Sequence, residues 1–482
     1  MRRTFPIALL AATVAACASQ TPEQRAIADV ADALGGADRI LAVHTLVLEG
    51  EGTLWNTGQD MTIDATGQTF SVTGYRRAMD LEASRMRVTQ TRTPNFPYFQ
   101  GQSPQTQTFG VDGEVAYAMN ASGAATRAPA ETAADRQAEL YHHPIVLVRA
   151  ALGPQASVGN VRNDGGEQLV DITLPDAGPF TLALDAATHR PTRIRSASDH
   201  PNLGDVVIET RFDGYTEVDG LQLPEQLTTS TDRFKTAELS LSRPTLNGEI
   251  GDIAAPETAR AAATPGPSPV NVAAEALAPG VWLLAGQSHH SVLVEFDDHL
   301  MLIEAPQSEA RTLGVMARAR ELVPGKPLTQ LVSTHHHFDH SAGLRAAVAE
   351  GLTIVTQQAN VAYYREAVTR PHTRRPDALA RSPKPIAVEG VEDARVIEDK
   401  TRRVELYRIA GSPHADTLLM AYLPRERLLV EADAFNPGSS VYPFAANLLE
   451  QVRARKLRVD RIAPLHGAVA PLAELVNAVP AS

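Results

Sequence analysis

The sequence predicts an α+β protein in which a mostly antiparallel β domain with one or two helices precedes a domain of alternating strands and helices. The chain has 482 residues, more than one hydrophobic core normally serves. Apolar residues alternate with period two over about residues 45–251, whereas strand-like and helix-like runs alternate over residues 270–482. A proline- and alanine-rich stretch, residues 252–269, predicts a linker without a regular helix or inner strand.

The N-terminus has the pattern of an export signal. Arg2 and Arg3 precede an apolar run that is too short to span a bilayer. We therefore predict that residues 1–16 are a signal peptide and that the protein is exported. The run ends in Val14-Ala15-Ala16-Cys17, which resembles the lipobox of bacterial lipoproteins and implies lipidation of Cys17. The alternative is an ordinary cleaved signal with an incidental cysteine.

Lipidation of Cys17 would anchor the protein stably and leave its domains in the periplasm. By the same resemblance, Ala18 favours the outer membrane. Membrane contact is then expected through the N-terminal anchor only. Cys17 is the only cysteine of the chain, so an internal disulfide is impossible.

The elements of the first domain follow from caps, alternation and turns. Residues 17–44 hold a helical segment that starts at the capping box Thr21-Pro22-Glu23-Gln24. The strands that follow are separated by turn signals such as Asp164-Gly165. A helical insertion over about residues 134–152, with Pro144 inside it, is expected to pack on one face of the sheet.

The second domain opens with a strand meander over about residues 280–304, and a helix over about 309–322 follows. The next strand leads into Ser333–Gly343, which reads STHHHFDHSAG. In an extended segment alternate side chains share a side, so His335 and His337 can converge on one metal ion. Asp339 and His340 could serve a neighbouring ion. His336 points away, and we interpret it as structural.

The pattern His-x-His-x-Asp-His resembles the signature of the metallo-β-lactamase superfamily. Further donors of that family follow in its order, each after an apolar run. The resemblance covers about residues 270–480 and implies an αβ/βα sandwich. The ligands that it implies are His335, His337 and His414 for one ion, Asp339, His340 and His466 for the other, and Asp433 as the bridge. The family commonly carries Asp-x-Gly where this chain has Glu304-Ala305-Pro306, so whether Glu304 replaces that aspartate is open.

The donor set predicts the chemistry. Imidazoles and carboxylates without a thiolate suit two Zn²⁺ ions, although Fe²⁺, Mn²⁺ or Co²⁺ would fit the same donors. Such ions lower the pKa of bound water from about 16 to about 7, which provides a bridging hydroxide at neutral pH. The predicted function is hydrolysis of an ester, lactone, thioester, lactam or phosphodiester-type bond in a small-molecule substrate. Asp339 is the candidate catalytic residue, which would pass a proton to the leaving group.

Composition and motif details narrow this prediction. The net charge is −12 and no basic block occurs, which weighs against nucleic acid as a partner. Lactamases with a ligating thiolate are excluded because the domain has no cysteine, and Asp433 weighs against the serine-substituted ones. Flavodiiron reductases have Glu in place of His337.

Two other functions stay open. One is a mononuclear-iron enzyme of the persulfide dioxygenase type, which shares much of the ligand set. The other is an envelope binding or assembly lipoprotein whose metal domain is vestigial. His289 and His290 are interpreted as a solvent-exposed pair, because loops are mostly surface. No motif identifies substrate-binding residues or the oligomeric state.

Overall fold

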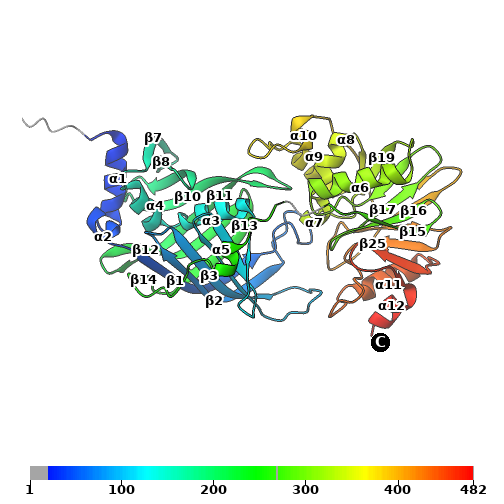
Figure 1. Ribbon diagram of the computed structural model, residues 1–482, viewed down its shortest axis with the longest axis horizontal. Coiled ribbons are helices and arrows are strands. Elements are labelled where there is room, and N and C mark those ends of the chain that lie inside the picture. Colours follow the sequence, from blue (N-terminus) through cyan, green and yellow to red (C-terminus); the bar gives the residue numbers. More distant parts are fainter. Residues whose placement is uncertain (1–19, 267–269, 481–482) are drawn as a thin grey trace, which may run out of the picture.

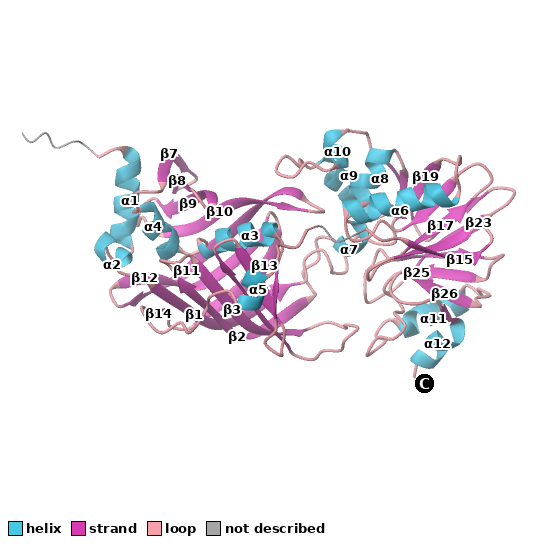
Figure 2. Cartoon of the chain, in the orientation of Figure 1, coloured by secondary structure: helices cyan, strands magenta, loops and turns pink. Residues whose placement is uncertain are grey.

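The computed structural model describes residues 20–266 and 270–480 (Figure 1). The predicted signal peptide and Cys17, the predicted lipidation site, lie outside the described residues. Within the described ranges, no helix combines the length and apolar character that a membrane crossing would need. The chain forms a strand-rich N-terminal part and a C-terminal part in which helices flank two sheets (Figure 2). The α+β class predicted from the sequence is therefore confirmed.

The first element, α1 (Pro22–Ala33), begins at the predicted capping box. The Thr21 hydroxyl accepts from the Gln24 backbone N–H at 3.2 Å, and the Gln24 side chain accepts from the Thr21 N–H at 3.1 Å. These reciprocal bonds satisfy two donors that would otherwise lack a partner inside the helix. A short helix, α2 (Ala37–Leu41), leads into the sheet.

The N-terminal sheet has fourteen strands and is antiparallel throughout. The strands are β1 (Thr45–Trp55), β2 (Thr69–Asp80), β3 (Arg85–Pro94), β4 (Gln105–Asp112), β5 (Val115–Met119), β6 (Ala125–Arg127), β7 (Ser157–Asp164), β8 (Glu167–Leu174), β9 (Gly178–Asp185), β10 (Pro191–His200), β11 (Gly204–Val218), β12 (Leu221–Thr231), β13 (Phe234–Leu241) and β14 (Thr245–Leu246). β1 pairs with β13, so the two ends of the strand series meet in the middle of the sheet.

The single helical insertion predicted for residues 134–152 is two helices, α3 (Ala130–Leu140) and α4 (Pro144–Ala151). Pro144 begins the second helix, because proline lacks an N–H and is tolerated only in the first turn. Both helices pack on the sheet through buried residues such as Leu140 and Leu147.

The stretch 252–269 was predicted to lack a regular helix, and that part of the prediction is wrong. α5 (Glu257–Ala261) starts directly after Pro256 and buries Ala259 against Tyr117 of β5. The prolines that argued against a helix flank this turn and leave its interior free. Residues 267–269 lie outside the described part of the chain.

The C-terminal part has two sheets. The seven-stranded sheet holds β15 (Ala273–Ala278), β16 (Val281–Ala285), β17 (Ser291–Glu295), β18 (Leu300–Ile303), β19 (Leu328–Val332), β20 (Thr353–Gln357) and β21 (Ala387–Val391). The six-stranded sheet holds β22 (Ala394–Glu398), β23 (Arg403–Arg408), β24 (Leu419–Leu423), β25 (Leu428–Glu431), β26 (Arg461–Pro464) and β27 (Ala470–Pro471). The helices are α6 (Glu309–Leu322), α7 (Phe338–Ser341), α8 (Leu344–Glu350), α9 (Asn360–Thr369), α10 (Ala378–Arg381), α11 (Ala445–Ala454) and α12 (Leu472–Ala478).

Two hydrophobic clusters define the layers of this part. One joins the sheets face to face, with Val292 and Met301 from one sheet against Leu406 and Leu429 from the other. The other cluster joins the opposite face of the seven-stranded sheet to α6, α8 and α9. β18 is buried along its whole length, as expected for a strand covered on both faces.

Candidate metal centre

The candidate donors lie in loops that leave neighbouring strand ends. Parallel strands β18, β19 and β20 end side by side, and β25 and β26 do so in the other sheet. The loop after β19 carries the histidine-rich segment, whereas Asp433 follows β25 and His466 follows β26. Open α/β sheets place functional groups at such ends because the loops there converge.

Asp433 lies at the centre of the cluster. Its Oδ2 is 2.8 Å from His340 Nε2, 3.2 Å from His414 Nε2 and 3.4 Å from His335 Nε2. Its Oδ1 is 3.1 Å from His466 Nε2. The residue adopts a left-handed φ of 59°, a conformation that costs energy outside glycine and that recurs at functional sites as well as in turns. One carboxylate thus faces four imidazoles.

The donors form two adjacent groups of four in which every ligand atom lies within 4.8 Å of the others, and a third group joins Glu304 to His335 and His340. The first group is His335, His337, His414 and Asp433, and the second is His289, Asp339, His340 and His466. The structure therefore brings together all seven residues that the sequence analysis proposed as ligands, and it adds His289. His336 belongs to neither group, and its Nδ1 lies 2.9 Å from the Thr417 hydroxyl.

The spacing of the imidazoles fits cation binding. His335 Nε2 and His414 Nε2 lie 3.4 Å apart, and two nitrogens at about 2.0–2.1 Å from a tetrahedral zinc ion lie about 3.3 Å apart. His337 donates through Nε2 to the Asp60 carbonyl at 2.9 Å, while its buried Nδ1 has no hydrogen-bond partner among the described residues. Nδ1 is therefore the atom of His337 that is free to bind a cation.

Neighbouring groups fix the orientation of the other rings. His340 donates through Nδ1 to Glu304 at 3.1 Å, and His466 donates through Nδ1 to the Ser288 carbonyl at 2.9 Å. Each bond holds the proton on Nδ1 and leaves Nε2 as the free donor atom. Both Nε2 atoms face Asp433.

The sequence left open whether Glu304 takes the place of the family's usual aspartate, and the structure shows what its carboxylate contacts. It is fully buried at the end of β18, has a left-handed φ of 80°, and accepts from the Thr334 N–H at 3.2 Å as well as from His340. The Thr334 hydroxyl donates to the same carboxylate and lies 3.0 Å from His335 Nδ1. In this chain a glutamate thus makes the supporting contacts behind two of the histidines.

The N-terminal part also reaches the site, which the sequence analysis missed. The segment between β1 and β2 places Gln59 Nε2 2.7 Å from Asp339 Oδ1 and the Asp60 carbonyl against His337. Gly58 accepts from the Phe338 N–H at 3.2 Å, and a Cβ on Gly58 would lie 2.2 Å from the Phe338 ring. Turn residues such as these carry no sequence signal for a distant contact.

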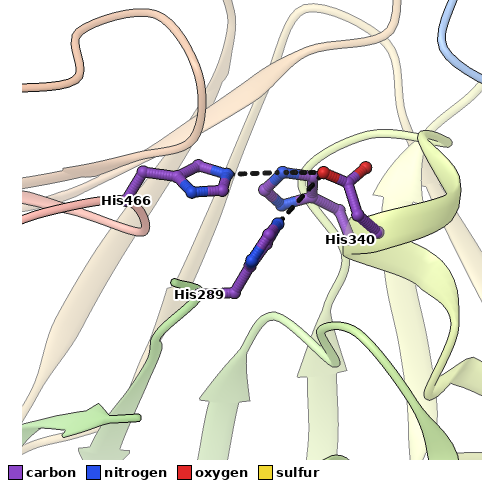
Figure 3. Close-up of side chains that lie close together, drawn as sticks. His289, His340 and His466 are labelled. Atoms are coloured by element: carbon purple, nitrogen blue, oxygen red, sulfur yellow. Dashed lines mark hydrogen bonds and ion pairs between the residues drawn. The ribbon is translucent and has the colours of Figure 1, made fainter. Parts of the chain in front are cut away.

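The prediction of an exposed His289–His290 pair is wrong. Both side chains are buried, because the loop between β16 and β17 folds over the cluster and the His290 N–H donates to the Leu465 carbonyl at 2.9 Å. His289 Nε2 lies 3.0 Å from Asp339 Oδ2. Figure 3 shows the rings of His289, His340 and His466 lying close together.

The charges of the site favour a bound cation. Burial lowers the pKa of His335 and His337 well below the usual value, so both rings are neutral and able to bind a metal. Burial opposes ionisation of Asp433, but His340 and His466 hold its pKa well below the usual range. Burial likewise opposes protonation of His340, yet Asp433 and Asp339 raise its pKa. A divalent cation would take the place of that proton.

Comparison with known proteins agrees with this geometry. Residues 284–466 match the family model of the Metallo-beta-lactamase superfamily. The match includes both groups of candidate ligands and begins in the seven-stranded sheet. No curated protein sequence matches the chain.

Solved metallo-beta-lactamases resemble part of the chain. The DIM-1 metallo-beta-lactamase shares 15% identity at a TM-score of 0.35, covering 43% of this chain and 94% of its own. The metallo-beta-lactamase from Pontibacter korlensis shares 16% identity at a TM-score of 0.34, and the match covers 43% of this chain and 96% of that protein. The metallo-beta-lactamase from Hirschia baltica shares 17% identity at a TM-score of 0.34, and the match covers 43% of this chain and 95% of that protein.

Proposed function

We propose that this protein is a metal-dependent hydrolase with a dinuclear, zinc-preferring centre. The observation that carries the proposal is the pair of adjacent donor groups, in which Asp433 of the first group also contacts His340 and His466 of the second. One ion would be held by His335, His337 and His414, and the other by Asp339, His340 and His466. The absence of a thiolate from the described cluster and its wealth of imidazoles favour Zn²⁺ over softer or harder ions.

The bound cations and the side chain of Asp339 would have different roles in hydrolysis. Bound cations would supply an activated water nucleophile and polarise the substrate's carbonyl or phosphoryl oxygen. Asp339 is held ionised although burial opposes it, because His340, His289 and Gln59 lower its pKa. The ionised carboxylate can therefore hold a cation, while its lowered pKa makes it a weak base; we propose that it takes up a proton only transiently and passes it to the leaving group.

The direction of substrate approach follows from exposure. The Asp339 side chain is 39% exposed and the Asp433 side chain 7% exposed. Among these residues, the open side of the centre is thus the side of Asp339. The substrate classes that suit this chemistry are esters, lactones, thioesters, lactams and phosphodiesters.

The test is a hydrolysis panel of these bond types with the purified soluble form. His337→Ala should abolish turnover, whereas His299→Ala, which changes a histidine outside both donor groups, should leave it unchanged. Unchanged turnover of the His337 variant would favour the binding or assembly function instead. Metal analysis should give two ions per chain. One iron ion per chain, together with oxygen uptake, would contradict the hydrolase and favour the mononuclear-iron dioxygenase.

We also propose that the protein is exported and anchored to the outer membrane through Cys17. Cys17→Ser should move the protein from the membrane fraction to the soluble periplasmic fraction. Cytoplasmic accumulation of the wild-type chain would contradict export.

A further inference from the structure

A cavity of about 560 Å³ lies in the N-terminal part of the protein. Its walls come from β1 to β4, from β10 to β13 and from α3, and none of the candidate metal ligands lines it. The volume falls in the range of about 300–1,000 Å³ that small-molecule pockets occupy. The cavity is therefore a candidate ligand site separate from the metal centre.

Most of the cavity wall is apolar. Leu54, Val88, Phe109, Leu227 and Leu239 come from five strands and face the same space. Filling it with water would leave these side chains hydrated, whereas a hydrocarbon chain would remove their surface from water at a gain of about 25 cal/mol per Å². The wall thus suits a flexible apolar chain.

One charged side chain projects from this wall with weak internal partners. Arg77 of β2 is 4% exposed. Its Nε donates to the Met86 sulfur at 3.0 Å, a weak acceptor, and its Nη2 donates to the neutral Glu139 carbonyl. Its Nη1 is 4.0 Å from the Glu139 carboxylate, which is itself 43% exposed. A buried guanidinium is better stabilised by a close, bidentate carboxylate.

The other buried polar groups of the wall satisfy one another. His142 Nδ1 lies 2.9 Å from the Thr210 hydroxyl and Nε2 lies 2.8 Å from the Ser196 hydroxyl. The further charged groups that line the cavity are the carboxylates of Asp135, Glu139 and Asp199 and the exposed guanidinium of Arg374. Arg77 is therefore the buried cationic group that an entering anion would meet inside the cavity.

We propose that this cavity binds a single-chain fatty acid, with the carboxylate paired to Arg77 and the hydrocarbon chain against the apolar wall. The inference does not depend on the hydrolase function, because it concerns a different part of the molecule. Neutral and cationic amphiphiles have no anionic group that could pair with the Arg77 guanidinium, so we expect them to bind more weakly.

The test is isothermal titration calorimetry of the full mature protein with dodecanoate, below its micelle concentration. We expect one site per chain. Arg77→Met keeps an apolar side chain of similar length and should weaken dodecanoate binding by about tenfold or more, because it removes a charged pair. The matched control is Arg76→Met. Its side chain is 37% exposed, lies on the opposite face of β2 by alternation, and does not line the cavity.

A second variant keeps the proposal testable if Arg77→Met fails to fold. Ala138→Phe adds bulk from α3 to a position that lines the cavity, and it should abolish binding in a protein that still unfolds cooperatively. Absence of dodecanoate binding to the wild type would overturn the proposal. Equal affinity for dodecanol and dodecanoate, or for the wild type and Arg77→Met, would overturn the role of Arg77.

Discussion

Gln59→Leu tests whether the N-terminal part belongs to the metal centre. The substitution removes the 2.7 Å hydrogen bond from Gln59 Nε2 to Asp339 Oδ1 while retaining most of the side-chain volume. A hydrogen bond to a charged group contributes about 1.5–3 kcal/mol. Because Asp339 is 39% exposed, water replaces part of this bond, and we take the lower end of that range. Only the part of this energy that differs between the metal-free and the metal-bound centre acts on affinity; loss of such outer contacts typically weakens metal binding by about 10–100-fold, and about tenfold corresponds to about 1.4 kcal/mol.

The expected result is about tenfold weaker binding of one of two zinc ions, measured by competition with a chromophoric chelator. The other ion should be unaffected, since Gln59 contacts none of its proposed ligands. Gln102→Leu is the matched control, because that exposed amide of the same sheet region donates only a long 3.4 Å bond to a neutral carbonyl. Equal affinity of the Gln59 variant and the wild type for both ions would refute the reasoning.

Two further predictions concern the supports of the fold and the site. Burial lowers the pKa of His143 to about 3. Below about pH 6.5, therefore, the unfolded chain binds a proton that the folded chain does not. The free energy of unfolding should then decrease by about 1.4 kcal/mol for each unit by which the pH is lowered. His143→Leu should make urea-unfolding midpoints less dependent on pH between 7 and 5, and an unchanged slope would contradict this origin. Glu304→Gln should weaken zinc binding by about 10–100-fold, because the carboxyl partner that orients His340 is lost. The exposed control Glu321→Gln should bind zinc like the wild type, and equal loss in both variants would point to a nonspecific charge effect.

Local patterns were sufficient for many elements of the fold. The capping box at Thr21 sets the start of α1 because its two hydrogen bonds join residues three positions apart. The helix expected over 309–322 has these bounds as α6. The 252–269 stretch shows the limit of such patterns, since α5 forms where Ala259 can pack on Tyr117. That contact joins residues far apart in the chain.

The sequence by itself determined the set of candidate metal donors, because they are encoded as side chains at the ends of apolar runs whose strands meet at one edge. It named His335, His337, Asp339, His340, His414, Asp433 and His466. Only the tertiary structure decided what surrounds them: Gln59 and Asp60 on one side, His289 on another, and Glu304 behind. These contacts depend on the positions of loops from separate elements. Long-range packing determines those positions, and no local sequence pattern encodes them.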